Sequence, residues 1–178
     1  QTMQQHQDYL AILMDQGLYG LFGNSFANWS VRYLADQGAS GPRAATVYKD
    51  VLYFQTASSR GDIFAWDGRQ LMMVSRSIVK DVTTYTVTDT CMTFYKGNVL
   101  ISYPQHAVVI VFNPDTLRID EQGTARMSFM KWTSYRVDQF MKNFGADDNR
   151  LFLGLDNTNV QIVRLDFSDF DNVTAAAT

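Results

Sequence analysis

The chain has 178 residues, of which 46% are hydrophobic and 19% charged, and this length suffices for one domain with a substantial core. Its net charge of −3, with no run of basic residues, argues against a general attraction to nucleic-acid phosphates. The single cysteine, Cys91, excludes an internal disulfide framework. No stretch approaches the ~18 apolar residues of a membrane span, and no signal peptide is visible. Because the chain opens on Gln1, we expect it to be processed or to be part of a longer polypeptide.

The first eight residues, QTMQQHQD (1–8), are polar and predict an N-terminal extension without a strand. The next segment, YLAILMDQGLYGLFG (9–23), has two apolar runs around a polar turn, which predicts a strand, a turn and a second strand. This hairpin opens a first unit near 9–42, with no strand upstream of Tyr9.

The second unit, near 43–88, has the most complete pattern. An upstream strand is expected in RAATVYKD (43–50), a hairpin in VLYFQTASSRGDIFAWDG (51–68) and an outer strand in QLMMVS (70–75). Asp67-Gly68 is a typical turn dipeptide. The strand before this turn is apolar on both faces, so we expect it to be covered on both sides. RSIVKDV (76–82) predicts a short helix or turn.

Two further units complete the chain, near 89–138 and 139–170. Upstream strands are expected in DTCMTFYKGN (89–98) and FMKNFGADDN (140–149), hairpins in VLISYPQHAVVIVFNPD (99–115) and RLFLGLDNTNVQIVRLD (150–166), and an outer strand of the third unit in RIDEQG (118–123). Residues 171–178 are expected to form a flexible C-terminal tail.

These units recur at a nearly constant interval. The hairpins place Leu21, Trp66, Phe112 and Leu165 at equivalent positions, with spacings of 45, 46 and 53 residues. A hairpin repeated every ~40–50 residues is typical of β-propeller blades. We therefore predict an all-β chain of repeated antiparallel sheets, with a β-propeller-like repeat domain over 9–170 that forms about four blades of an incomplete ring. A β-sandwich is the alternative fold, although it does not require a regular period.

Four units are few for a finished propeller, and the sheet edges left open at the two ends would favour pairing with other chains. We expect an arc that is completed by the rest of a longer polypeptide or by a partner.

Several short motifs follow one another in a characteristic order. A GASGPR loop (38–43) and the strand VLYF come before Asp67-Gly68, which is followed by LMMVSRSI (71–78). Later come FMKWTSYRV (129–137) and ADDNRLFLGLDNTNVQIVRLDF (146–167). This succession, over roughly residues 10–167, resembles the propeller-like structural proteins of tailed bacteriophages, especially tail hub and nozzle components of short-tailed phages. The resemblance implies a non-enzymatic virion protein that assembles into a ring at or near the tail.

The resemblance also implies the partners and the location. Other copies of the chain and neighbouring tail proteins would contact it, as part of an assembly that guides DNA passage or host attachment. Contact with DNA in a channel would be passive, since a mildly acidic lining disfavours binding to phosphates. We expect a virion protein, with a cytoplasmic protein as the alternative, and neither a membrane span nor a small-molecule cofactor.

The residues that most often carry catalysis are sparse. His6 and His106 are the only histidines, and no HxxxH, CxxC or HExxH pattern accompanies them, so we expect no metal site. Cys91 lies between Thr90 and Met92 and is expected to be a buried, inert thiol. No catalytic, cofactor-binding or metal residue is therefore predicted, and we expect that the chain is not an enzyme.

Carboxylates at turns deserve separate treatment, because many propellers cleave carbohydrates with paired acids. The candidates are Asp67, Asp115, Asp147, Asp148 and Asp156. All of them adjoin turn residues, so we expect their side chains to accept hydrogen bonds from the turn backbone. The segment DDNRLFLGLDNTN lacks the spacing of a known calcium loop.

Other patterns have structural explanations. Trp29, Trp66 and Trp132 are expected in the core, although an exposed one would offer a stacking platform to a glycan. The alternative function is thus a carbohydrate-binding or carbohydrate-cleaving propeller at a host surface. A cellular protein-interaction propeller is a third possibility, but WD-repeat and kelch motifs are missing. The RGD tripeptide (60–62) is expected to fill a turn, and the sequons at Asn28 and Asn172 matter only in a secretory setting.

Overall fold

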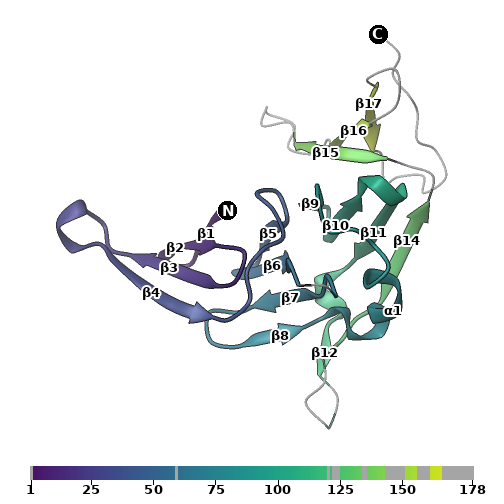
Figure 1. Cartoon of the computed structure of the whole chain (residues 1–178). Coiled ribbons are helices and arrows are strands. Elements are labelled where there is room, and N and C mark those ends of the chain that lie inside the picture. The colour runs from purple at the N-terminus through teal and green to yellow at the C-terminus, as the bar shows by residue number, and fades with distance from the viewer. Residues whose placement is uncertain are drawn as a thin grey trace.

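The computed structural model describes residues 2–58, 60–119, 121, 125–133, 136–142, 151–155 and 161–165. Antiparallel strands dominate these residues, and one short helix accompanies them. The predicted all-β class is therefore confirmed (Figure 1). No helix in the described part of the chain is long and apolar enough to cross a membrane.

The first sheet is a four-stranded meander. It contains β1 (Thr2–His6), β2 (Tyr9–Leu13), β3 (Leu18–Phe22) and β4 (Ser30–Ala35), paired in that order. Our prediction that no strand precedes Tyr9 was wrong, because β1 pairs with β2 along its whole length in the segment expected to be an extension. Thr2 and His6 are buried on one face of this strand, whereas Met3 and Gln5 are exposed on the other, and β2 supplies the hydrogen bonds that this polar strand lacks by itself.

The second sheet follows the predicted unit closely. It contains β5 (Ala45–Tyr48), β6 (Val51–Gln55), β7 (Ile63–Trp66) and β8 (Leu71–Met73), again in chain order. Lys49 and Asp50 form the tight β5–β6 turn with positive φ angles of 46° and 57°. The predicted short helix is present as a 3₁₀ turn at Ser75–Ile78 followed by α1 (Val79–Val82).

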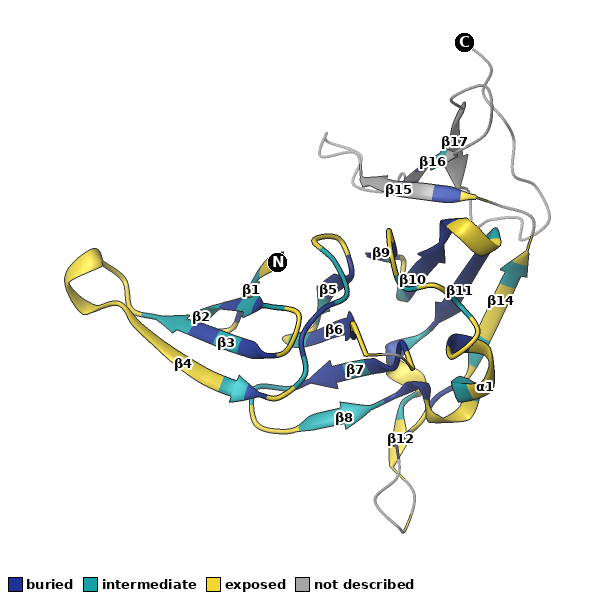
Figure 2. Cartoon of the chain, in the orientation of Figure 1, coloured by how far each residue is buried: buried dark blue, intermediate teal, exposed yellow. Residues whose placement is uncertain are grey.

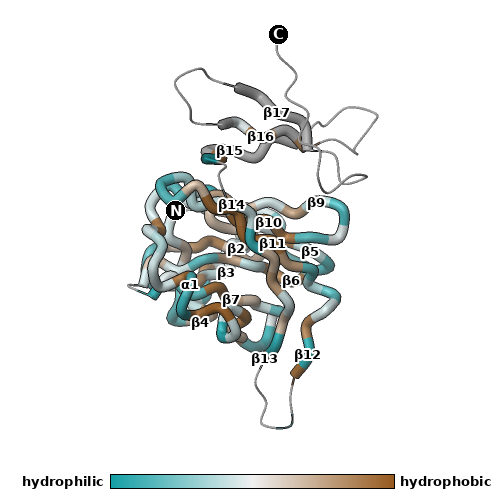
Figure 3. The backbone as a smooth tube through the Cα atoms, turned by 90° about the vertical axis from the view of Figure 1, so that its right-hand side faces the viewer, coloured by the Kyte–Doolittle hydropathy of each residue, from teal (hydrophilic) through white to brown (hydrophobic). Residues whose placement is uncertain are grey.

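The third sheet contains β9 (Cys91–Tyr95), β10 (Asn98–Tyr103), β11 (Val108–Phe112) and β14 (Phe129–Thr133). The outer strand predicted at 118–123 was wrong: β12 (Arg118–Ile119) pairs instead with β13 (Ala125–Arg126) in a separate hairpin. This hairpin projects from the molecule in two perpendicular views (Figures 1 and 3). Segment 129–133 forms the edge strand of this sheet beside β11, because Phe129 packs against the core between the second and third sheets. Segment 118–123 (RIDEQG) has three charged residues and offers no aromatic side chain for that position.

The fourth sheet contains β15 (Val137–Lys142), β16 (Leu151–Leu155) and β17 (Gln161–Leu165) in that order. Its first strand starts three residues before the predicted segment. The rest of that segment, 143–149, and the predicted tail at 171–178 lie outside the described residues.

The four sheets are stacked in series, with one apolar core between each successive pair. The first core joins sheets one and two through residues such as Leu13, Leu18 and Phe54. The second joins sheets two and three through Tyr53, Ile101 and Phe112, among others, and the third joins sheets three and four. The second and third sheets are thus covered on both faces, as predicted for the strand β7 (Figure 2).

The first strands of successive sheets lie next to one another. Contacts join β1 to β5, β5 to β9 and β9 to β15, and the backbone N–H of Met92 at β9 donates to the carbonyl of Arg43 just before β5 at 2.8 Å. The outer strands β4, β8 and β14 lie on the far side of the series (Figure 1). The sheets therefore fan out from the side on which their first strands meet.

Candidate functional site

The most distinctive surface of the molecule is the face of the first sheet that points away from the second sheet, here called the outer face. The strand registers place its residues in two cross-strand rows. The rows are Met3–Ile12–Tyr19–Tyr33 and Gln5–Leu10–Leu21–Val31. Seven of these eight residues are apolar or aromatic, a composition typical of a covered sheet face, yet no residue that the structure describes covers this one.

Burial separates the two faces sharply. On the inner face, Ala11, Leu13 and Leu18 are completely buried against the second sheet. On the outer face, Met3 is 60% exposed and Val31 64% exposed. Because successive residues of a strand point to opposite faces, the same strands create both surfaces. The outer face is therefore a second apolar surface, separate from the core, on strands that are paired with one another.

The outer face also lacks charge. Neither row contains a lysine, arginine, aspartate or glutamate, and Gln5 is its one polar side chain apart from the tyrosine hydroxyls. Depletion of charge and enrichment of tyrosine, together, characterise the centres of protein interfaces. A contiguous exposed surface of this composition on a monomer marks an interaction site.

The β3–β4 connection extends the outer face and ends in an aromatic pair. Gly23 turns the chain with φ +113°, a conformation in which a Cβ would approach the carbonyl oxygen of Asn28 to 2.5 Å. The Asn28 side-chain oxygen accepts from the N–H groups of Asn24 and Ser25 at 3.1 and 2.9 Å. This bonding holds the tip together while Phe26 and Trp29 remain 87% and 46% exposed, with ring centroids 4.2 Å apart.

The tryptophans divide between core and surface. Trp66 lies in the core, as predicted, and Trp132 is half-buried. The same prediction was wrong for Trp29, because a loop of small polar residues, Asn24-Ser25 and Asn28, carries it beyond the second sheet. An aromatic pair inside a polar turn was a sequence signal for exposure that our prediction missed.

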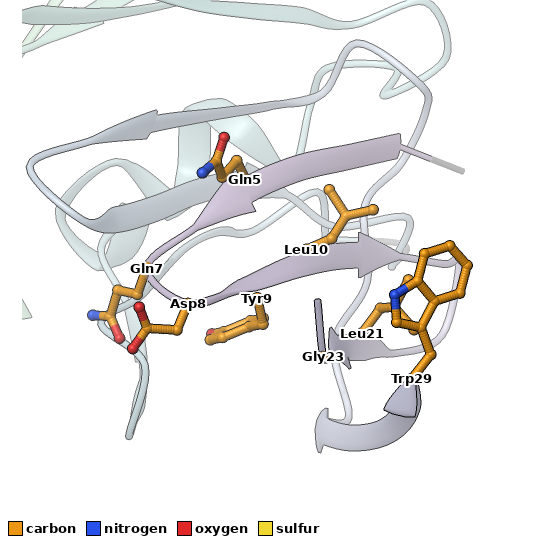
Figure 4. A pocket seen from close by; sticks show the side chains of 8 residues that line it. All are labelled: Gln5, Gln7, Asp8, Tyr9, Leu10, Leu21, Gly23 and Trp29. Carbon is orange, nitrogen blue, oxygen red and sulfur yellow. The ribbon is translucent and has the colours of Figure 1, made fainter. Parts of the chain in front are cut away.

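A pocket of about 400 Å³ opens on the outer face. Its lining residues are Gln5, Gln7, Asp8, Tyr9, Leu10, Leu21, Gly23 and Trp29. Figure 4 shows the Trp29 indole beside Leu10 and Leu21, with Gln7 and Asp8 at the other end, in the turn between β1 and β2. The lining thus combines an aromatic ring, aliphatic side chains and a few amide or carboxylate groups, as the lining of small-molecule sites commonly does.

Two hydrogen bonds connect residues of the pocket to the second sheet and the turn that follows β7. The Trp66 indole N–H donates to the Tyr9 hydroxyl at 2.7 Å, and the Gln7 amide donates to the carbonyl of Asp67 at 3.3 Å. Partial burial raises the pKa of Tyr9, an effect that the hydrogen bond from Trp66 opposes. The phenol therefore stays neutral at physiological pH and acts as a structural acceptor.

The two histidines lie in different environments. His6 is buried between the first two sheets, where no described residue offers its ring nitrogens a hydrogen bond, and its ring lies 5.1 Å from that of Tyr9. His106 lies in the β10–β11 turn, as predicted, and accepts from the Thr86 N–H at 2.8 Å. Within the part of the chain that the structure describes, no three His, Cys, Asp or Glu side chains are grouped to hold a metal ion.

Cys91 is buried, as predicted. It begins β9, and its thiol donates to the carbonyl of Val137 at 3.8 Å. The neighbouring Ser102 hydroxyl donates to the same carbonyl at 2.5 Å. Both side chains thus help to attach the fourth sheet to the third.

The predicted turn carboxylates act as structural groups where the structure describes them. Asp67 accepts from the backbone N–H groups of Arg69 and Gln70, each at 2.8 Å. Partial burial acts to raise the pKa of Asp67, but the backbone donors of Gln70 and Arg69 outweigh it and hold that pKa below its usual value. The prediction of a turn role is confirmed for Asp67, whereas Asp147, Asp148 and Asp156 lie outside the described residues.

Asp115 differs from the prediction in its partners. Its carboxylate accepts from the Lys49 ammonium at 2.9 Å and from the Tyr48 hydroxyl at 3.1 Å, so it links the third sheet to the β5–β6 turn. These bonds, that from Lys49 foremost, lower the pKa of Asp115. The turn around it is closed by Asn113, whose side chain accepts from the Asp115 N–H at 2.9 Å.

The remaining sequence patterns have structural roles. Gly61 supplies a positive φ of 59° in the turn before β7, and Arg60 pairs with the buried Asp62 at 3.5 Å. The RGD tripeptide thus fills a turn, as predicted. The sequon asparagine Asn28 uses its side chain to hold the β3–β4 tip, and Asn172 lies outside the described residues.

Neither a family model nor a curated protein matches the chain.

Proposed function

We propose that this chain is a non-enzymatic structural component of a bacteriophage tail, a hub- or nozzle-like part of a larger ring. In this proposal the four sheets are consecutive blades of a propeller-like array. The outer face of the first sheet is the surface through which the array continues into the rest of the assembly. The observation that carries the proposal is that this face is apolar and uncharged, and that no described residue covers it.

The stacking of the sheets supports a propeller-like array over a sandwich. A sandwich encloses one core between two sheets. Here the second sheet contributes to two separate cores, and so does the third. Each complete sheet is a four-stranded meander whose first strand meets the first strand of the next sheet, an arrangement typical of propeller blades.

The first strands support a role beside DNA without tight binding. In a ring of blades these strands line the central channel. Strands β1 (TMQQH), β5 (ATVY) and β9 (CMTFY) contain no lysine, arginine, aspartate or glutamate, and β15 (VDQFMK) contains one aspartate and one lysine. Affinity for DNA comes mainly from cationic contacts with phosphates. A channel lined by these strands would let DNA slide, and the expected mildly acidic lining becomes one without net charge.

The test is to find where the chain resides. Virions purified from a lysate that contains this chain are analysed by mass spectrometry, and an antibody against the chain is imaged on them by negative-stain electron microscopy. We expect the chain to copurify with the particles and the antibody to label the tail. Recovery of the chain only in the particle-free fraction would overturn the proposal.

The pocket at Trp29 favours one second candidate, a glycan-binding module at a host surface. Trp29 offers an exposed ring, and Gln5, Gln7 and Asp8 provide the amide and carboxylate groups that bind sugar hydroxyls. On a glycan array, Trp29→Ala would abolish binding. Met130→Ala is the control, since Met130 is 45% exposed and lies on β14 rather than at the pocket. Absence of binding by the unmodified chain would remove this candidate.

A further inference from the structure

We propose that the pocket beside Trp29 binds the ring of a neutral sugar, and that Asp8 makes the pocket reject sugars that carry an acidic group. The inference deepens the second candidate function, the glycan-binding module, and rests on it. Its evidence is the arrangement of apolar and polar groups in the pocket, the polar groups that have no partner within the described chain, and the sign of the charge that lines the pocket.

The apolar side of the pocket comes from two neighbouring strands and the β3–β4 tip. Leu10 on β2 pairs with Leu21 on β3, so their side chains lie next to each other on the outer face. The Trp29 indole lies beside both of them (Figure 4). Phe26 packs on that indole, with ring centroids 4.2 Å apart, and does not line the pocket. Trp29 is thus supported by an aromatic neighbour and still accessible to a ligand.

The polar side of the pocket carries groups that the fold does not use. Gln5 is the cross-strand neighbour of Leu10, and Asp8 lies in the β1–β2 turn. Among the described residues, neither side chain has a hydrogen-bond partner, whereas the Gln7 amide donates to the carbonyl of Asp67 at 3.3 Å. An amide both donates and accepts, but a carboxylate only accepts. A ligand that binds Asp8 must therefore bring hydroxyl or N–H donors.

These two sides together fit a pyranose ring. Such a ring has a face of C–H groups, which can pack on an aromatic side chain, and edges with hydroxyl groups that donate and accept hydrogen bonds. Most of the lining residues are exposed, so a bound ligand keeps part of its surface in water, which a wholly apolar ligand would not favour. The volume of about 400 Å³ is near the lower end of the range for small-molecule sites. It suits a terminal sugar unit.

The charge of the pocket selects among sugars. Asp8 is the only Asp, Glu, Lys or Arg among the lining residues. Arg32 of the same sheet belongs to the row Gln4–Ala11–Gly20–Arg32 on the opposite face, and its guanidinium lies over the Phe22 ring, 4.8 Å from the centroid. A carboxylate, sulfate or phosphate on the ligand would therefore meet the Asp8 carboxylate without a counter-charge. Such an unpaired contact between like charges discriminates against the wrong ligand.

The first test is a glycan array that carries neutral oligosaccharides beside sialylated and sulfated versions of the same cores. The unmodified chain should bind the neutral members at least about tenfold more tightly. Trp29→Ala should abolish this binding, whereas Trp29→Phe should retain part of it, because the smaller ring still packs on the sugar. Since Trp29 is 46% exposed, both variants should fold, which circular dichroism checks.

The second test changes the charge alone. Asp8→Asn keeps the shape of the side chain and removes the repulsion, so it should narrow the difference between neutral and acidic glycans to about twofold or less. Asp50→Asn is the matched control. Asp50 follows Lys49 in the β5–β6 turn as Asp8 follows Gln7 in the β1–β2 turn, both aspartates are exposed, and Asp50 does not line the pocket. The control should keep the preference of the unmodified chain.

Three results would overturn the inference: equal or tighter binding of the acidic versions by the unmodified chain, binding of neutral glycans that survives Trp29→Ala, or an Asp50→Asn effect equal to that of Asp8→Asn. Failure here is distinguishable from failure of the proposed functions. Binding of acidic glycans that depends on Trp29 would refute this inference and keep the glycan-binding candidate. Absence of any glycan binding would refute both, and the tail assignment would still be decided by the virion experiment.

Discussion

The central strands of the first and third sheets are rich in apolar residues, but the two sheets lie in different environments. All five residues of β11, VVIVF, are buried, because sheets lie on both of its faces. In the first sheet, Leu10 and Ile12 of β2 remain partly exposed, and β4 is the most exposed strand of that sheet (Figure 2). The comparison teaches that a strand that is apolar on both faces is expected to be covered on both, and that no described residue covers the outer face of the first sheet.

The largest expected effect comes from a matched pair of leucines. Leu100→Ala in the third sheet removes a completely buried side chain and should lower the free energy of unfolding by about 2–5 kcal/mol. Leu10→Ala on the outer face should cost less than about 1 kcal/mol, because solvent already reaches that side chain. Urea unfolding of both variants at a concentration at which the chain is monomeric measures the difference. Equal losses would mean that the outer face is already covered within one chain.

Alkaline pH should weaken the core between the second and third sheets. Burial, followed by the nearby charge of Asp115, raises the pKa of Tyr53 to about 12 from an ordinary value of 10.0. A raised pKa means that the contribution to stability is complete below pH 10 and is lost as the pH rises towards 12. Two pKa units correspond to a loss of the order of 2–3 kcal/mol.

Unfolding free energies measured between pH 9 and pH 12 (roughly the range over which a phenol titrates) would test this. Tyr53→Phe should show a smaller alkaline loss than the unmodified chain. Part of the loss should persist, because burial also raises the pKa of Tyr103. Identical pH profiles for the two proteins would contradict a buried, neutral Tyr53.

A smaller effect is expected between the first and second sheets. Tyr9→Phe deprives the Trp66 indole N–H of its acceptor and should cost about 1 kcal/mol. Tyr33→Phe is the matched control, because Tyr33 lies on the outer face and is 59% exposed. This substitution should leave the stability of the monomer unchanged. Thermal unfolding compares the two variants. A loss in the control as large as that in Tyr9→Phe would show that the outer face contributes to the fold of a single chain.

The smallest effect belongs to the exposed bridge between Lys49 and Asp115. Such pairs contribute little to stability and are screened by salt. Because the pKa of Asp115 is lowered from 3.8, its contribution is present above that pH and is lost as the pH falls through the folded-state pKa. Asp115→Asn should therefore shift the unfolding midpoint slightly at neutral pH and low salt, and not at high salt. A large, salt-independent shift would show that the pair is more than a surface contact.

Much of the fold could be predicted because it depends on local chemistry. Alternating apolar residues and turn dipeptides such as Asp67-Gly68 specify hairpins over a few residues, and the hairpin of β6 and β7 lies where we predicted it. The strand β1 and the edge strand β14 were missed because both depend on a partner. A polar or charged segment becomes a strand when a neighbour supplies the hydrogen bonds, and hydrophobicity alone does not reveal that neighbour.

The sequence by itself determined the central hairpins of the sheets, the turn at Asp67-Gly68, the buried thiol of Cys91 and the alternating apolar positions of β2 and β3, which place apolar side chains on both faces of the first sheet. Only the tertiary structure decided which of those faces is covered. The physical reason is that the alternation of side chains specifies that a face avoids water, whereas the stacking of distant segments determines what lies against it. The same reason explains Trp29, whose exposure follows from the reach of the β3–β4 tip beyond the second sheet rather than from its own hydrophobicity.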